Sequence, residues 1–287
     1  MKIVIVSNYA PSLVNFRYQL LQAFVSKGHE VIAIAPKADA AVVTKLEAIS
    51  VAFEALPIQS AELNPLNDWK SYRALSERFK ALQPDMVFAY TIKPVIYGSI
   101  AAHRQGVKHI YSMITGLGSG FIGESLKYRL IKKVITRLYR IALKKNEKVF
   151  FQNADDLGLF VENKMVKMAQ TTLVNGSGVD LDYYQVEALP KTPRFLMLAR
   201  LLKDKGICEY VEAARQVKAQ YPEAQFDLAG DFSDNPSVIS PQTIDEWQKE
   251  GVINYLGHLD DVRPTMATAS VFVLPSYREG TPRSVLE

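Results

Sequence analysis

Short apolar runs alternate with helix-patterned stretches along most of the chain. In the first part, the apolar runs cover residues 2–8, 30–36, 85–90, 109–114 and 148–153. Between the first two runs, apolar residues recur at helical spacing until Gly28, a residue type that commonly ends a helix. Strands that alternate with helices in this way predict a parallel, doubly wound sheet.

The same alternation begins again near residue 193. The second series has apolar runs at 194–200, 225–230, 253–257 and 271–276. A helical stretch, 208–222, separates the first two of them. We therefore predict an α/β protein with two Rossmann-like domains, residues 1–175 and 176–287, joined near 175–193.

Residues 126–148 depart from this pattern because they are dense in Lys and Arg and contain one acid, Glu147. On a helix, six cations gather on one side, and Ile131, Val134, Ile135, Leu138 and Ala142 gather on the other. The cations are Arg129, Lys132, Lys133, Arg137, Arg140 and Lys144. Two interpretations are open: a solvated surface helix, or a surface that docks on anionic lipid at about 1 kcal/mol per cation. The density of charge favours docking.

Composition narrows the class of protein. The chain has 287 residues, of which 48% are hydrophobic, with a net charge of +4 and a single cysteine, Cys208. One cysteine allows neither a disulfide framework nor a cysteine metal cluster, which fits a reducing cytoplasm. The sequence shows no membrane span and no signal-peptide layout, and the modest charge does not indicate a nucleic-acid partner.

Two carboxylates flank a Gly-Thr-Pro turn after the last apolar run. We expect Thr281 to cap a helix that begins at Pro282. Glu279 then lies in the loop, and Glu287 lies about six residues into the helix, roughly 9 Å along its axis. A helix N-terminus between two acids suits a phosphate flanked by two hydroxyl-rich groups.

Two cations come at the matching point of the 194–200 run. Arg200 ends that run and Lys205 lies in the following loop, where ligands bind in open α/β sheets. A cationic pair there suits a diphosphate. Either residue alone could be an ordinary surface charge, and the nearby acid pair weakens that alternative.

Four motifs carry a family resemblance. NGSGVD (175–180), ARLLKDKG (199–206), LGHLDDV (256–262) and PSYREGTPRSVLE (275–287) resemble the C-terminal domain of glycosyltransferase family 4. Glu279 and Glu287, with seven residues between them, have the spacing of its glutamate pair. The resemblance implies the GT-B fold, in which two Rossmann-like domains face a cleft, and retention of anomeric configuration.

A finer resemblance comes from residues 8–24, 92–102 and 115–121. They are similar to the bacterial branch that adds sugars to undecaprenyl-diphosphate-linked saccharides for capsule, O-antigen or glycoprotein glycans. The implied donor is a UDP-linked N-acetylhexosamine or a related hexose. The implied location is the cytoplasmic face of the membrane.

The family pattern implies a donor site. Arg200 and Lys205 would hold the diphosphate and stabilise the charge on the leaving phosphate. Glu279 would bind hydroxyls of the transferred sugar, the backbone of Gly280 and Thr281 would lie near the phosphates, and Glu287 would hold the ribose. Neither a metal nor another cofactor is expected.

The sequence departs from the family at two places. Thr115 occupies the position at which many members have a histidine, so a histidine role does not transfer. The family continues beyond the second glutamate, so we expect the second domain to be incomplete at its C-terminus and the activity of the chain as it stands to be in question.

On the acceptor side, Asn15 and Arg17 are expected near a helix start, and Lys93 follows the 85–90 run. A lipid diphosphate needs cations, so these residues, with Thr115, are candidates for acceptor binding. Ordinary surface residues are the alternative. The loop 115–123 contains four glycines and could approach a ligand closely or form a lid.

Two other functions stay open. A sugar-nucleotide epimerase of GT-B type would use similar phosphate contacts, and an inactive, membrane-associated nucleotide-sugar-binding module would bind the donor without turnover. A dinucleotide dehydrogenase is disfavoured, since VSNYAPS after the first apolar run lacks the G-x-G-x-x-G fingerprint.

Overall fold

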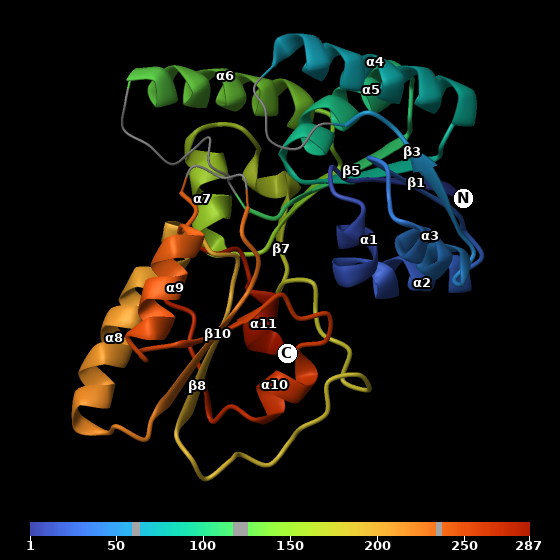
Figure 1. Ribbon diagram of the computed structural model, residues 1–287. Helices are drawn as coiled ribbons and strands as arrows, with labels where there is room; N and C mark the ends of the chain where they lie inside the picture. Colours follow the sequence, from blue (N-terminus) through green and yellow to red (C-terminus); the bar gives the residue numbers. More distant parts are fainter. Residues whose placement is uncertain (59–63, 117–125, 234–236) are drawn as a thin grey trace. The chain divides into compact units, whose positions relative to one another are not determined.

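The computed structural model describes residues 1–58, 64–116, 126–233 and 237–287, with no side-chain placement for 126–128. The chain separates into two compact units, Met1–Ser177 and Gly178–Glu287, here called the first and second unit. Each unit contains a parallel sheet with helices packed on it, which confirms the predicted α/β class (Figure 1).

The first unit is built on a seven-stranded sheet in the order β3-β2-β1-β4-β5-β6-β7. All neighbouring strands are parallel. The strands are β1 (Lys2–Val6), β2 (Glu30–Ala35), β3 (Val51–Ala55), β4 (Met86–Tyr90), β5 (His109–Ile114), β6 (Lys148–Phe151) and β7 (Thr171–Leu173). The order of connection reverses between β1 and β4, which is the place where open α/β sheets bind ligands at their carboxyl edge.

Helices cover both faces of this sheet, because successive side chains of a strand point to opposite sides. Ile3 and Ile5 belong to the core under α1 (Pro11–Phe16), α2 (Tyr18–Ser26) and α3 (Ala40–Glu47). Val4 and Val6 belong to the opposite core. That core packs against α4 (Pro65–Leu82), the π-helix η1 (Pro94–Gly98), α5 (Ser99–Arg104), α6 (Leu126–Leu143) and α7 (Ala154–Glu162); a short 3₁₀ helix, η3 (Met168–Gln170), precedes β7.

The second unit has a four-stranded parallel sheet in the order β10-β9-β8-β11. Its strands are β8 (Arg194–Leu198), β9 (Gln225–Ala229), β10 (Asn254–Gly257) and β11 (Val271–Phe272). Its helices are the 3₁₀ helix η4 (Lys203–Lys205), α8 (Ile207–Gln220), α9 (Pro241–Lys249), α10 (Arg263–Ala267) and α11 (Arg283–Leu286). Here the connection reverses between β8 and β11, so the loops after these two strands lie at the switch point.

Three local expectations were wrong. The helix expected within 15–28 is two helices, α1 and α2, which meet at Arg17. Asn15 therefore lies in the last turn of α1 and not near a helix start, whereas Arg17 lies at the start of α2, as expected. The cationic segment is helical only as far as Leu143, so Lys144 lies beyond the end of α6 and not on its cationic face.

Candidate functional site

The carboxyl edge of the second sheet brings together the loops that follow β8 and β11. These strands pair in parallel, with Phe195 opposite Val271 and Leu196 opposite Phe272. The residues after them therefore leave the sheet side by side. The loop after β8 carries Arg200 and Lys205, and the loop after β11 carries Glu279.

Two glycines allow the backbones at this edge to approach closely. Gly206 has φ of +75°, and a Cβ built on it would lie 2.3 Å from the carbonyl oxygen of Pro275. Gly230 has φ of +151°, and its Cβ would lie 1.8 Å from the carbonyl oxygen of Ala199. No other residue fits either position without displacing backbone. The loop that carries Lys205 consequently packs directly against the loop after β11.

Lys205 and Glu279 form an ion pair at this contact. The two loops are joined a second time by the backbone amide of Tyr277, which donates to the carbonyl oxygen of Asp204 at 3.1 Å. Lys205 is the last residue of the 3₁₀ helix η4, whose C-cap is Gly206, so its backbone direction is set by the glycine contact. The arrangement holds a cation and a carboxylate side by side, as recognition of a phosphate next to a hydroxyl-bearing group requires.

Arg200 differs from Lys205 in its surroundings. Its side chain is exposed, and it has no hydrogen-bond or ion-pair partner within the described part of the chain. Ser276 is a residue at this edge that the sequence reasoning missed. Its Oγ is buried and has no hydrogen-bond partner among the described residues. The exposed guanidinium of Arg200 is therefore available to a ligand at the edge.

Glu287 does not lie where the sequence placed it. Pro282 has extended backbone (φ −70°, ψ 118°) and precedes α11, so neither Thr281 as N-cap nor Pro282 as first helical residue is correct. Glu287 lies at the C-cap of the four-residue α11. Few peptide dipoles add up in a single helical turn, so the predicted donor site depends on charged side chains more than on a helix dipole. Gly280 and Thr281 are half-buried in the loop before it.

The carboxylate of Glu287 has two partners in its own unit. Arg283 pairs with it at 2.6 Å. Burial, together with a hydrogen bond to Glu287, raises the pKa of Tyr184 to about 12. Glu287 also lines a cavity of about 610 Å³ beside the segment 179–189. Tyr184 and Arg283 are contacts that the motif alone did not indicate.

The carboxyl edge of the first sheet holds a strained residue at its switch point. Thr91 directly follows β4 and has φ of +71°, a left-handed conformation that is costly for a β-branched side chain. Its Oγ1 donates to Oδ1 of Asn8, which follows β1, at 2.8 Å. Strain of this kind tends to persist at functional sites. Both residues follow strands at the reversal of strand order, which the sheet topology shows and the sequence alone does not.

The predicted acceptor residues lie in different environments. Asn15 is exposed on α1, whereas Arg17 is buried with its guanidinium 4.8 Å from the centre of the Tyr90 ring. Thr115 follows β5 and is half-buried. Of the glycine-rich loop 115–123, only Thr115 and Gly116 are described. The remainder, 117–123, lies outside the described residues.

Lys93, the fourth predicted acceptor residue, is buried after β4. Its Nζ lies 2.8 Å from Oδ1 of Asp68 on α4. Tyr97 donates from its hydroxyl to the other carboxylate oxygen of Asp68 at 3.0 Å. Burial, followed by the nearby charge of Asp68, raises the pKa of Tyr97 well above its usual range. The positive charge of Lys93 is therefore balanced within the fold.

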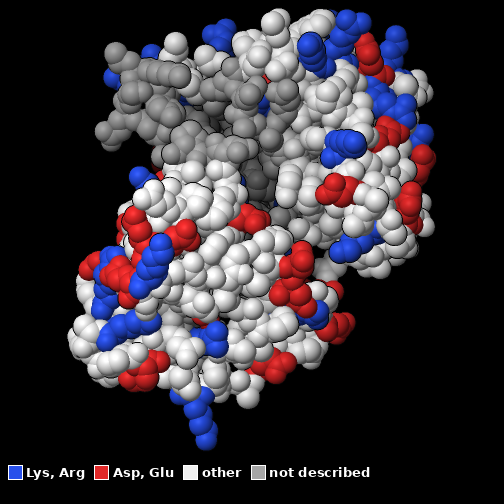
Figure 2. Space-filling model, viewed as in Figure 1, with Lys and Arg blue, Asp and Glu red and all other residues white. Residues whose placement is uncertain are grey.

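The charge of α6 differs from that of the helices in the second unit. All six predicted cations are exposed, and five of them line a hollow of about 540 Å³: Arg129, Lys132, Lys133, Arg137 and Arg140. Over α8 and α9, by contrast, acidic and basic side chains lie next to one another (Figure 2). There Arg215 on α8 pairs with Glu250 at 2.6 Å. On α6, in contrast to α8 and α9, the side chains around this hollow carry one sign of charge.

His258 belongs to the LGHLDDV motif. It is exposed after β10 and its Nδ1 lies 2.8 Å from Asp231. Within the described ranges, no cluster of three or more His, Cys, Asp or Glu side chains could hold a metal ion. In the same ranges, no helix has the length and apolar character needed to cross a membrane.

Comparison with known proteins gives relatives along the whole chain. A Campylobacter jejuni protein named N,N'-diacetylbacillosaminyl-diphospho-undecaprenol alpha-1,3-N-acetylgalactosaminyltransferase is 29% identical over 301 residues, covering 100% of this chain and 77% of that protein. An Escherichia coli UDP-Gal:alpha-D-GlcNAc-diphosphoundecaprenol alpha-1,3-galactosyltransferase is 26% identical, covering 81% of this chain and 62% of its own length. The chain thus spans less than two thirds of the second relative.

Solved structures match the fold. Sucrose-phosphate synthase from Thermosynechococcus elongatus has a TM-score of 0.72 at 17% identity, over 98% of this chain and 76% of that one. A glycosyltransferase from Rickettsia africae has a TM-score of 0.68 at 17% identity, over 96% and 73%. The two parallel sheets are therefore those of the GT-B fold, as predicted.

Family matches agree with these relatives. Residues 192–287 match the family described as Glycosyl transferases group 1. Residues 2–153, more than half of the chain, match the family described as Glycosyl transferase 4-like. The chain therefore belongs to the glycosyl transferase 4-like family and is a glycosyltransferase.

Proposed function

We propose that this glycosyltransferase retains the anomeric configuration of a UDP-linked N-acetylhexosamine or related hexose and transfers it to a saccharide on undecaprenyl diphosphate. Two relatives are named for transfer to undecaprenyl-diphosphate-linked saccharides. Such a substrate makes the cytoplasmic face of the membrane the proposed place of action. The ion pair of Lys205 and Glu279 is the observation on which the donor site rests.

The proposed reaction uses the charges at this edge. An acceptor hydroxyl attacks the anomeric carbon, the bond to the nucleoside diphosphate breaks, and the hydroxyl proton passes to the departing phosphate. Lys205 and Arg200 stabilise the negative charge that grows on that phosphate. Glu279, held beside Lys205, accepts hydrogen bonds from the sugar hydroxyls.

A screen of donors tests this proposal. We expect transfer from one of UDP-GalNAc, UDP-GlcNAc, UDP-Gal or UDP-Glc to an undecaprenyl-diphosphate-linked saccharide, with the anomeric configuration of the product read by NMR. A rearranged donor without transfer would instead identify an epimerase. Donor binding by calorimetry without either product would identify a nucleotide-sugar-binding module. The parallel Glu279→Gln protein controls for contaminating activity.

We also infer that the cationic face of α6 docks on anionic membrane. Each cation near such a surface adds about 1 kcal/mol, so replacing Arg129, Lys133 and Arg137 by Gln should weaken vesicle binding roughly a hundredfold. The matched control replaces Lys27, Lys37 and Lys45, which are exposed elsewhere on the first unit. Both variants lose the same charge, so equal loss of co-sedimentation would reject a specific docking face.

Salt gives an independent reading of the same proposal. Attraction between exposed charges is screened beyond a Debye length of about 8 Å at physiological ionic strength. Binding should therefore rise with the fraction of anionic lipid and fall as salt is added. Vesicle binding that does not respond to salt would argue against the cationic face.

A further inference from the structure

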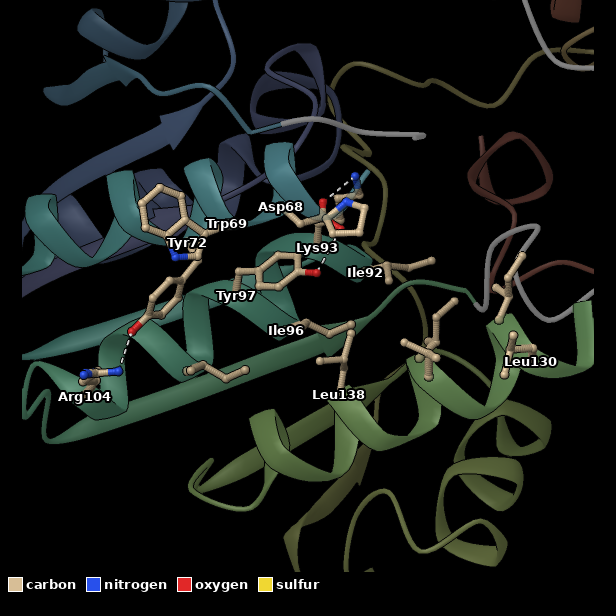
Figure 3. A pocket seen from close by; sticks show the side chains of 15 residues that line it. Asp68, Trp69, Tyr72, Ile92, Lys93, Ile96, Tyr97, Arg104, Leu130 and Leu138 are labelled. Carbon is tan, nitrogen blue, oxygen red and sulfur yellow. Dashed lines mark hydrogen bonds and ion pairs between the residues drawn. The ribbon is translucent and has the colours of Figure 1, made fainter. Parts of the chain in front are cut away.

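An apolar groove lies on the first unit between α4, α5 and α6 (Figure 3). Its volume of about 600 Å³ falls within the range of roughly 300 to 1,000 Å³ that is typical of small-molecule sites. Trp69, Ile96, Leu130, Val134 and Leu138 are among the side chains that line it. The walls are therefore almost entirely hydrocarbon.

The groove leaves part of the apolar face of α6 open. Along this face, Ile135 and Ala142 are buried in the core of the unit. Leu130 and Val134, on the same helix, are exposed in the groove, and so is Trp69 on α4. Contiguous apolar side chains that stay exposed beside a cavity indicate a ligand or partner more than a packing requirement.

The groove begins next to the carboxyl edge of the first sheet. Figure 3 shows Tyr72 and Arg104 toward one end, Leu130 at the other, and the Asp68, Lys93 and Tyr97 cluster between them. Ile92 and Lys93, which line the groove, come directly after Thr91, the residue that follows β4 at the switch point. A molecule bound at the carboxyl edge of β4 could thus extend straight into the groove.

The charges of the groove favour an uncharged occupant. Lys93 is balanced by Asp68 at 2.8 Å, and the cations of α6 line a separate hollow. The remaining cation of the groove, Arg104, lies at one end, where it donates to the hydroxyl of Tyr72 at 3.4 Å (Figure 3). One side of α6 is therefore apolar and lines the groove, and another side is positively charged. That division matches a lipid whose chain is apolar and whose neighbours are anionic headgroups.

We propose that this groove binds the polyisoprenyl chain of the lipid-linked acceptor. The inference rests on the proposed function, because that function supplies an acceptor with a single hydrocarbon chain next to a diphosphate. Continuity with the carboxyl edge of β4 selects this chain over the acyl chains of the bilayer, which have no link to the substrate edge. The groove thereby recognises the carrier, while the donor edge recognises the sugar.

The first experiment measures binding without turnover. The chain has two tryptophans, so Trp247→Phe leaves Trp69, in the groove, as the sole tryptophan reporter. We expect farnesyl diphosphate to change its emission saturably and inorganic diphosphate to leave it unchanged. Equal responses to both ligands, or no response to farnesyl diphosphate, would overturn the proposal.

A matched pair of variants locates the binding. Val134 lines the groove and is 52% exposed, whereas Ile141 is 54% exposed on the same helix and does not line it. In the Trp69 reporter background, Val134→Asp should weaken farnesyl diphosphate binding at least tenfold, and Ile141→Asp should leave it within twofold. Similar effects of the two substitutions would reject the groove as the site.

Two further outcomes separate the alternatives. If neutral phosphatidylcholine vesicles produce the same Trp69 response and Val134→Asp abolishes it, the occupant is a bilayer acyl chain and the proposal is wrong. If no donor supports transfer while Val134→Asp still loses farnesyl diphosphate, the proposed function fails and the groove assignment stands. If transfer occurs and Val134→Asp leaves the KM for a long-chain acceptor unchanged, the groove assignment fails alone.

Discussion

Two lysine–carboxylate pairs lie at the carboxyl edges of the two sheets, and they differ in burial. The Lys93 and Asp68 side chains are 9% and 13% exposed, in the wall of an apolar groove. The Lys205 and Glu279 side chains are 21% and 24% exposed, between two loops. The pair in the first unit also holds the hydroxyl of Tyr97, so it joins α4 to η1, whose N-cap is Lys93.

This difference predicts different roles for the same chemistry. A buried pair has lost its hydration, so removing one partner costs several kcal/mol. A pair that water reaches contributes little to stability, and its charges can exchange partners with a ligand. The pair in the first unit should therefore support the fold, and the pair in the second unit should support substrate binding.

The largest effect should come from Asp68→Ala. This substitution removes the carboxylate that faces buried Lys93 and the acceptor of the Tyr97 hydrogen bond. We expect the free energy of unfolding of the protein to fall by about 3–5 kcal/mol in urea titrations followed by circular dichroism.

The double variant Asp68→Leu with Lys93→Met sharpens this prediction. Replacing both charges by apolar side chains of similar volume is often neutral or stabilising. A stable double variant with weakened acceptor binding would support the predicted acceptor role of Lys93. If the double variant is as unstable as Asp68→Ala, the instability of Asp68→Ala does not come from the unpaired charge of Lys93.

Breaking the second pair should act on turnover. Lys205→Ala and Glu279→Gln should each lower kcat/KM about a hundredfold, which is on the order of 3 kcal/mol of transition-state stabilisation. Unfolding free energies should stay within about 1 kcal/mol of the parent. Arg215→Ala, in the exposed pair with Glu250, is the control and should change neither quantity. Near-normal turnover of either variant would contradict the placement of Lys205 and Glu279 in the donor site.

The glycine contact that positions Lys205 should give an intermediate effect. Gly206→Ala combines a left-handed φ with a Cβ 2.3 Å from the carbonyl oxygen of Pro275, so a cost of about 1–3 kcal/mol and weaker donor binding are expected. Gly251→Ala is the matched control, because Gly251 has a similar left-handed φ of +74° and a Cβ at this position would have no atom within 4 Å. Donor affinity measured by calorimetry should fall only for Gly206→Ala.

Thr115→Ala should have the smallest effect. If Thr115 merely occupies a position at which relatives have a histidine, transfer should fall less than tenfold. If Thr115 instead transfers a proton in the reaction, the rate of sugar transfer should fall by about two orders of magnitude or more. Steady-state kinetics at saturating donor distinguish these outcomes, and a large loss with unchanged donor affinity would contradict the milder role.

The sequence predicted the central strands because they are buried on both faces and are therefore mainly apolar. Strands β1, β2, β4, β5 and β6 correspond to such runs, as do β8 and β9. Strands β3 and β7 were not predicted. They lie at the edges of the first sheet, where one side has no partner strand and polar residues are tolerated. The first residue of α11, the short helix after β11, was also predicted wrongly. Pro282 is compatible with both extended and helical backbone, so the sequence did not decide between them.

Residue order alone determined the fold class, the family and which side chains could carry charge at the strand ends. Tertiary structure decided which of those charges meet. Lys205 reaches Glu279 because Gly206 lets two distant loops touch, and Lys93 turns inward because α4 places Asp68 over it. The groove likewise exists only where α4, α5 and α6 come together. Periodicity reports the environment of each element, whereas contacts between elements depend on packing over long sequence separations.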